Sequence, residues 1–148
     1  MKVKMVDVGE KHDVLRVAEA RGRIRLKTDT VRRIKEGRID KGDVVAAAQI
    51  AGILAAKKTP ELIPLCHPIP ITGVDIDVEA GDSFVEVKAT VRSVGKTGVE
   101  MEALTAVSIA LLVVWDMCKQ YEKDEYGQYP ETVIEEVRVV NKLKEEKG

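Results

Sequence analysis

The sequence has few aromatic residues and no long hydrophobic run. It contains one Phe, one Trp and three Tyr among 148 residues, too few for a platform on which nucleic-acid bases stack. The longest apolar run, residues 109–115, is far shorter than the roughly 20 residues that a membrane-spanning helix needs. The N-terminus lacks the basic and apolar pattern of a secretory signal. We therefore expect a cytoplasmic protein that binds neither nucleic acid nor membrane.

Charge is balanced and metal-binding patterns are missing. The 24 basic and 25 acidic residues are interspersed and give a net charge of −1, unlike a one-sided nucleic-acid-binding surface. Cys66 and Cys118 are too few for a disulfide framework, and neither C-x-x-C nor H-x-x-x-H occurs. We expect reduced thiols and no metal site. With 45% hydrophobic and 33% charged residues, residues 1–148 are expected to form one globular domain.

The first part of the chain predicts an arm, a strand and two helices. Residues 1–21 show no firm periodicity and are expected to form an N-terminal arm, whereas residues 22–27 alternate basic and apolar side chains like a strand. Thr28 or Asp29 is expected to cap a helix that ends near Gly37. A second helix is expected over residues 41–57.

Small residues recur every four positions in that second helix, at Ala48, Gly52 and Ala56. Such a stripe lets another backbone approach closely. It fits either helix–sheet packing within one chain or a contact between subunits.

The rest of the chain predicts a hairpin, a long helix and a last strand. Residues 71–78 and 83–94 alternate apolar and polar side chains around a turn at residues 80–82. Residues 99–121 are apolar almost all round at their middle and predict a buried helix. Residues 133–143 again alternate apolar and polar side chains and predict the last strand. Helices on one face of a largely antiparallel sheet make an α+β domain.

Three segments are richer in reactive side chains than packing requires. Residues 65–68, Leu-Cys-His-Pro, lie in a proline-rich loop that would present His67 with little freedom, although a lone His often only makes a local hydrogen bond. Residues 95–102 put glycines before a helix N-terminus, which favours an anion, but they lack the upstream glycine of a P-loop. The two glutamates there could simply complement the helix dipole.

The third segment is Asp116-Met117-Cys118-Lys119. Asp116 and Lys119 lie three apart and so share one helix face, where they form either a proton-transfer pair or a plain surface ion pair. Glu102 lies fourteen residues before Asp116, about 21 Å away along the helix axis. One small substrate cannot touch both ends, so either the two ends do different jobs or a site takes one end from each of two chains. We favour the shared site, with antiparallel copies of this helix meeting in a dimer.

These segments carry a family resemblance. The runs LIPLCHP (residues 62–68) and GKTGVEMEALTA (residues 95–106), with MVDV at 5–8 and KGDV at 41–44, resemble the molybdenum cofactor biosynthesis protein C family over nearly the whole chain. The resemblance implies a ferredoxin-like fold assembled as a hexamer, a trimer of dimers with sites at the dimer interface. It also implies conversion of 3′,8-cyclo-7,8-dihydro-GTP into cyclic pyranopterin monophosphate with release of pyrophosphate.

The resemblance assigns roles to individual residues. Those implied to be catalytic are Asp116, Lys119, Lys41 and Lys142; those implied to bind the substrate are Leu65, Cys66, His67, Glu100, Met101 and Glu102. The lysine Lys142 is followed by Leu-Lys-Glu-Glu-Lys-Gly, where many members have Ser-Gly-Gly-Lys-Ser-Gly, so a flexible glycine closure is not expected.

The implied chemistry suits these residue types. Lysines and a histidine can neutralise a triphosphate and assist pyrophosphate departure. No overall redox change occurs, so no cofactor is expected, although Mg²⁺ can accompany the phosphates. The alternative is a non-catalytic nucleotide- or pterin-binding module of the same fold.

Overall fold

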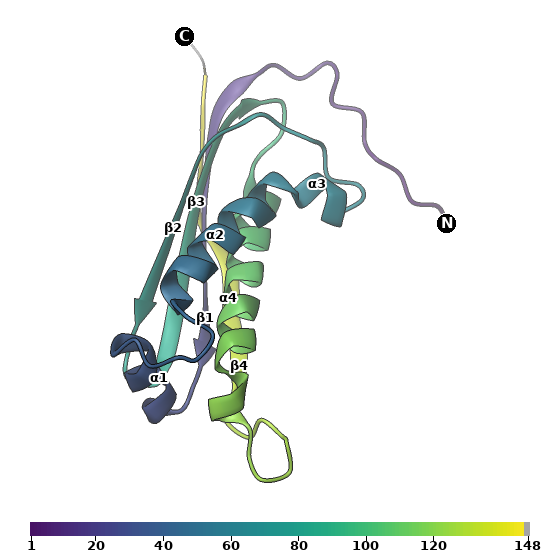
Figure 1. Cartoon of the computed structure of the whole chain (residues 1–148). Coiled ribbons are helices and arrows are strands. Elements are labelled where there is room, and N and C mark those ends of the chain that lie inside the picture. The colour runs from purple at the N-terminus through teal and green to yellow at the C-terminus, as the bar shows by residue number, and fades with distance from the viewer. Residues whose placement is uncertain (147–148) are drawn as a thin grey trace.

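The computed structural model describes residues 1–146 as a four-stranded antiparallel sheet with helices on one face (Figure 1). Along the chain the elements are β1 (Val14–Arg25), α1 (Thr28–Lys35), α2 (Val44–Lys57), α3 (Thr59–Leu62), β2 (Ile71–Ala80), β3 (Phe84–Gly95), α4 (Glu100–Glu122) and β4 (Val133–Glu145). The strands are ordered β2-β3-β1-β4. Two strand–helix–strand units joined by the β2–β3 hairpin give the ferredoxin-like arrangement, so the predicted α+β class is confirmed.

The core lies between the central strands and α4. Alternate residues of β1 and β3 are buried on the helix side, and several are alanines, which let the helix approach the sheet closely. Helix α4 is long and apolar enough to cross a membrane, but over half of its apolar window is buried in the structure, where the helix packs against α2 and the sheet. Its Leu111 is fully buried, so truncation to alanine would cost about 2–5 kcal/mol.

The small-residue stripe of α2 packs within the chain. Ala48, Gly52 and Ala56 are all buried. A Cβ at Gly52 would lie 3.1 Å from Ile76 Cδ1 and 3.4 Å from the carbonyl oxygen of Ala106, so glycine lets α2 approach both β2 and α4. Of the two interpretations of the stripe, packing within one chain is therefore correct and the subunit contact is wrong.

The predicted arm of residues 1–21 is too long. Strand β1 begins at Val14, and only residues 1–13 precede it as an extended arm. The alternation was hidden because the buried face of the strand carries Arg16, Ala18 and Ala20, while the opposite face carries the apolar residues Leu15 and Val17. The expected strand at residues 22–27 is only the end of β1.

Two helix starts also differ from expectation. The N-cap of α1 is Lys27, and Asp29 lies in the first turn, where its carboxylate accepts hydrogen bonds from Arg32 and Arg33. Helix α2 begins at Val44, because the Asp43 carboxylate caps it by accepting a hydrogen bond from the Ala46 N–H at 3.0 Å. Lys41 therefore lies in the connecting loop and not on the helix.

Candidate active site

The predicted site residues gather in two clusters at opposite ends of α4. The cluster at the C-terminal end, here called the lysine cluster, contains Lys41, Asp116 and Lys119. The cluster at the N-terminal end, here called the glutamate cluster, contains Cys66, Glu100, Glu102 and Lys142. As the spacing predicts, about 21 Å of helix separates them.

The lysine cluster is a carboxylate held between two ammonium groups. Lys41 Nζ lies 3.1 Å from Asp116 Oδ2 and also donates to the Asp116 carbonyl at 3.3 Å, while Lys119 Nζ lies 3.0 Å from Asp116 Oδ1. Lys41 comes from the loop before α2, whereas the other two lie three residues apart on α4. The side chains are 42–58% exposed, so the cluster faces open solvent on a single chain.

These contacts favour the charged forms of Asp116 and Lys119. Hydrogen bonds from Lys119 and then Lys41 lower the pKa of Asp116, and their charges add to the effect. The hydrogen bond and charge of Asp116 in turn raise the pKa of Lys119. Protonated Lys119 can therefore donate a proton or bind a phosphate oxygen, but it is not a ready base.

Glu102 is the buried member of the glutamate cluster. Glu102 is only 1% exposed, and the Cys66 thiol lies 3.7 Å from its Oε2. Its other oxygen, Oε1, is buried without a hydrogen-bond partner among residues 1–146. Burial raises the pKa of Glu102 despite hydrogen bonds that lower it, and the charge of Glu100 raises it further. A group of this kind can hold a proton that a free carboxylic acid would have lost.

Cys66 is a neutral thiol in this setting. Burial is the main cause that raises its pKa to about 11, and the charge of Glu102 and the hydrogen bond to Glu102 add to the rise. Cys118, on the buried side of α4, has its pKa raised to about 12, mainly by burial. Both cysteines are free, and neither has the lowered pKa of a nucleophilic thiolate.

The rim of the glutamate cluster is made by Glu100 and Lys142. The Lys142 ammonium, on β4, lies 3.7 Å from Glu100 Oε2. The Glu100 side chain folds back over Gly98, where a Cβ would collide with its carboxylate. The structure thus brings the predicted lysine of β4 to the helix N-terminus, although 42 residues separate Lys142 from Glu100 in the sequence.

The N-terminal arm contacts His67 and Lys96. The His67 ring nitrogen Nε2 is 2.5 Å from the carbonyl oxygen of Val6, and Lys96 Nζ donates to the Gly9 carbonyl at 3.3 Å. Leu65 and Met101 are exposed, at 41% and 39%. His67 therefore faces the arm, and we find it outside the contacts that define either cluster.

Sequence reasoning missed Arg16, which supports the loop before α4. This arginine is 9% exposed, and its guanidinium donates to the carbonyls of Gly95 at 3.0 Å and Lys96 at 3.1 Å. The loop is thereby fixed to β1 just before the residues of the glutamate cluster. A charged residue on the buried side of an alternating strand was the available signal, but it required recognising β1 from Val14 onward.

The residues available to hold a metal do not converge. Among residues 1–146, no three His, Cys, Asp or Glu side chains are grouped as a metal site would require. The charged groups that do converge are lysines beside carboxylates. Their chemistry suits phosphate binding and proton transfer.

The fold and the two clusters define the chain as a ferredoxin-like domain with lysines and carboxylates gathered at both ends of α4. The MoaC family model matches residues 5–145, and the chain belongs to that family. The resemblance carried by the two long motifs is thus confirmed.

Similar proteins from several archaea are each named "Probable cyclic pyranopterin monophosphate synthase". The Pyrococcus furiosus protein is 64% identical over 99% of this chain and 94% of its own length. The Thermococcus kodakarensis protein is 66% identical over 97% of this chain and 92% of its own length. The Archaeoglobus fulgidus protein is 59% identical over 97% of this chain and 92% of its own length. The similarity therefore spans the whole domain, including both clusters.

Proposed function

We propose that the chain is a cyclic pyranopterin monophosphate synthase of molybdenum cofactor biosynthesis. It would convert (8S)-3′,8-cyclo-7,8-dihydroguanosine 5′-triphosphate into the cyclic monophosphate and release pyrophosphate. The observation that carries this proposal is the pairing of family membership with the two clusters, which together supply cations for phosphates and a buried carboxyl group whose pKa is raised.

The reaction defines what the residues must do. A cyclic monophosphate forms from a triphosphate when an oxygen of the substrate attacks the α-phosphorus. The new P–O bond replaces the bond between the α-phosphorus and the oxygen bridging to the β-phosphate, which leaves with pyrophosphate. The attacking hydroxyl loses a proton, and the ring rearrangement moves further protons, so the site needs both cations and proton carriers.

The lysine cluster suits the phosphate end. Lys41 and Lys119 are both ammonium groups within 3.1 Å of one carboxylate, so an incoming phosphate would find two cations already oriented. Lys119, whose pKa is raised, would act as a general acid or an electrostatic stabiliser of the leaving group. Asp116 would hold both lysines in place.

The glutamate cluster suits the ring end. A buried carboxyl with a raised pKa is a candidate proton carrier for the ring rearrangement. Glu100 and Lys142 pair at its rim, and Cys66 contacts Glu102 from the loop before β2. Cys66, as a neutral thiol, would contribute shape and a weak hydrogen bond only.

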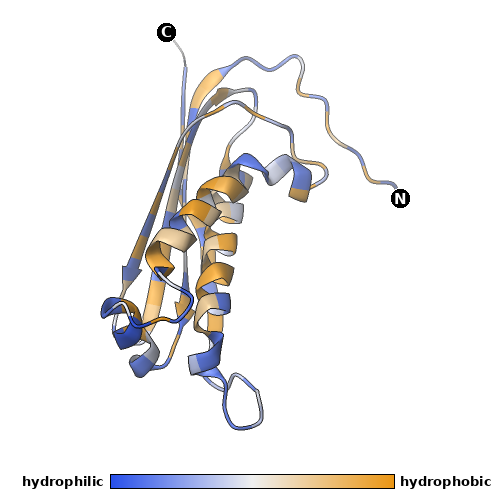
Figure 2. Cartoon of the chain, in the orientation of Figure 1, coloured by the Kyte–Doolittle hydropathy of each residue, from blue (hydrophilic) through white to orange (hydrophobic). Residues whose placement is uncertain are grey.

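The two clusters would form one site only when two chains meet. They lie too far apart on α4 for one substrate, and the lysine cluster is open to solvent. Between them, α2 and α4 expose Ile50, Leu54 and Leu112, which are 61%, 48% and 52% accessible; Figure 2 shows the apolar colouring of this helix layer. A second copy packed antiparallel on this face would bury these residues and bring its own lysine cluster to the glutamate cluster of the first.

The family resemblance supports a proposal for the wider assembly and setting. We propose a homohexamer, a trimer of such dimers, working in the cytoplasm. The only small-molecule partner in this proposal is the nucleoside triphosphate, with any Mg²⁺ arriving on its phosphates and no cofactor held by the protein.

The experiment that tests the reaction is incubation of the purified protein with the cyclised GTP intermediate. Pyrophosphate is measured by an enzyme-coupled assay and the pterin product by its fluorescence after oxidation. Stoichiometric pyrophosphate and product are expected. Tight binding of the nucleotide without pyrophosphate release would favour the non-catalytic binding module instead.

The assembly is tested by light scattering on the protein in solution. A mass of a dimer or of a multiple of dimers is expected at the concentration used for the assay. A strictly monomeric protein with full activity would rule out the shared site.

A further inference from the structure

The loop that carries Lys41 is not part of any helix or strand. It joins α1 to α2 over residues 36–43, and two of its glycines have positive φ, +69° at Gly37 and +120° at Gly42. A lysine side chain on such a loop has no reason to stay near Asp116 unless its backbone is held. What holds this backbone therefore decides whether the lysine cluster is preformed.

Two consecutive residues at the end of α4 hold the loop at Asp40, next to Lys41. The phenol oxygen of Tyr121 accepts a hydrogen bond from the Asp40 N–H at 2.9 Å. The Gln120 amide donates to Asp40 Oδ2, also at 2.9 Å. Backbone and side chain of the same residue are thus tied to the helix that carries Asp116 and Lys119.

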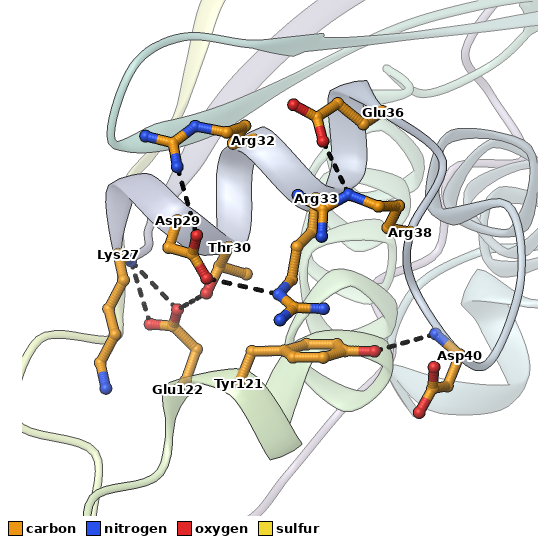
Figure 3. A network of polar contacts seen from close by, with 10 residues as sticks. All are labelled: Lys27, Asp29, Thr30, Arg32, Arg33, Glu36, Arg38, Asp40, Tyr121 and Glu122. Carbon is orange, nitrogen blue, oxygen red and sulfur yellow. Dashed lines mark hydrogen bonds and ion pairs between the residues drawn. The ribbon is translucent and has the colours of Figure 1, made fainter.

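The Tyr121 ring is itself fixed from several sides (Figure 3). The Arg33 guanidinium lies over its face, 4.6 Å from the ring centroid, and Asp29 holds that guanidinium by a hydrogen bond. The ring also packs against the hydrophobic core. The phenol oxygen is therefore already in place when it receives the Asp40 N–H.

The next residue, Glu122, locks this end of α4 to its surroundings. It is 1% exposed, and its carboxylate accepts hydrogen bonds from the Lys27 N–H and from the hydroxyls of Thr30 and Thr132. These bonds join α4 to the start of α1 and to the segment before β4. The C-terminal end of α4, from which Tyr121 projects, therefore has little freedom to move.

We propose that Tyr121 is a positioning residue, which acts through Asp40 to hold Lys41 against Asp116. This inference rests on the proposed function, because it assumes that Lys41 contacts the substrate. Tyr121 itself does not touch the lysine cluster. Its hydroxyl restricts the loop, so that the Lys41 ammonium needs no further ordering when a phosphate arrives.

The test is the substitution Tyr121→Phe, which removes the hydroxyl but keeps the ring beneath Arg33. About a tenfold loss of kcat/KM for the cyclised nucleotide is expected. In a Lys41→Ala background, the same substitution should cause no further loss, because Tyr121 acts only through Lys41. An equal loss in both backgrounds, or no loss in the first, would overturn the proposal.

Two matched variants separate positioning from general damage. Tyr126→Phe alters a tyrosine that is 78% exposed on the following loop, and it should leave kcat/KM unchanged. Gln120→Ala removes the second bond to Asp40 and should lower kcat/KM severalfold, again only when Lys41 is present. A loss that persists without Lys41 would count against the proposal.

A second readout does not depend on the reaction. In protein with ¹³C-labelled aspartate carboxyls, Asp116 can be titrated by NMR, and Asp116→Asn identifies its signal. Tyr121→Phe should raise the Asp116 pKa in the same direction as Lys41→Ala does, with no additional rise in the double variant. If the wild-type protein proves inactive, the proposed function fails while this titration still decides the role of Tyr121. An unchanged Asp116 titration would refute that role.

Discussion

The two ends of α4 place carboxylates in opposite environments. Asp116 lies in solvent between two lysines, which lower its pKa, whereas Glu102 is buried beside a thiol, where loss of solvation raises its pKa. One helix thus carries a carboxylate fixed in its charged form and another that favours its neutral form. The comparison teaches that residue type alone does not assign acid and base; burial and partners do.

The largest expected effect comes from breaking the lysine cluster. Asp116→Ala or Lys119→Ala should lower kcat by about a thousandfold or more, since the first releases both lysines and the second removes a cation at the proposed site of pyrophosphate departure. The measurement is pyrophosphate release under saturating substrate, with light scattering to show that the assembly survives. Lys123→Ala, at an exposed lysine just beyond the helix, is the control and should keep wild-type activity. A wild-type rate for either cluster variant would show that Lys119 and Asp116 do not act as the proposed acid–carboxylate pair.

Mixing two inactive variants sharpens the comparison between the ends. Asp116→Ala damages only the lysine cluster and Glu102→Gln only the glutamate cluster. If each site takes one cluster from each chain, a mixed dimer keeps one intact site. Unfolding and refolding the two variants together should then restore about a quarter of the wild-type activity, because about half of the dimers are mixed and each has one intact site of two. Activity of the mixture no greater than that of the separate variants would place both clusters in sites built from one chain.

The pH dependence of stability should have opposite signs at the two ends. The folded chain raises the Glu102 pKa above 4.5, so the stability from its protonated form is present below that pH and is lost as pH rises through the folded pKa. The melting temperature of Glu102→Gln, measured relative to that of wild type, should therefore increase as pH rises from 4 toward 8.

For Asp116 the linkage runs the other way. Its pKa in the folded chain lies below 3.8, so its contribution is present above that pH and is lost on further acidification. The melting temperature of Asp116→Asn should lie below that of wild type at neutral pH, and the two should converge as the pH falls below 3.8. Thermal unfolding over this pH range checks both variants, and parallel curves would contradict the assignment of opposite environments.

The smallest effect is expected at Cys66. With a pKa of about 11, its thiol is neutral at the pH of the reaction and is no nucleophile. Cys66→Ser should retain kcat/KM within about threefold, as expected for the loss of one weak contact. Alkylation by iodoacetamide at pH 8 should likewise be slow compared with that of a free thiol. Rapid alkylation and a loss of activity above a hundredfold would give the thiol a covalent role.

Much of the fold was predictable because its signals are local. The hairpin of β2 and β3 alternates cleanly, and the apolar middle of α4 marks a buried helix. The first half of β1 was not predictable in this way. Its buried face carries alanines and Arg16 in place of the large apolar residues that mark a strand in the sequence. Only its packing against α4 therefore reveals the strand.

The site was predictable in parts but not as an arrangement. The three motif segments contain most of its residues, and the fourteen-residue spacing on α4 correctly separated its two ends. The meeting of Lys41 with Asp116 joins residues 75 positions apart, and that of Lys142 with Glu100 joins the last strand to a helix N-terminus. Such pairings depend on how the sheet orders its strands, which no single motif encodes. The roles of these residues in catalysis stay predictions.

The length of α4 has a consequence for how the sequence can vary. One residue inserted between Glu102 and Asp116 would turn one end by about 100° and shift it by about 1.5 Å relative to the other. Cys66 and Lys41, which reach the helix from separate loops, could not both follow that rotation. Natural homologues should therefore confine gains and losses of residues to the stretch between α4 and β4 and keep this interval at constant length.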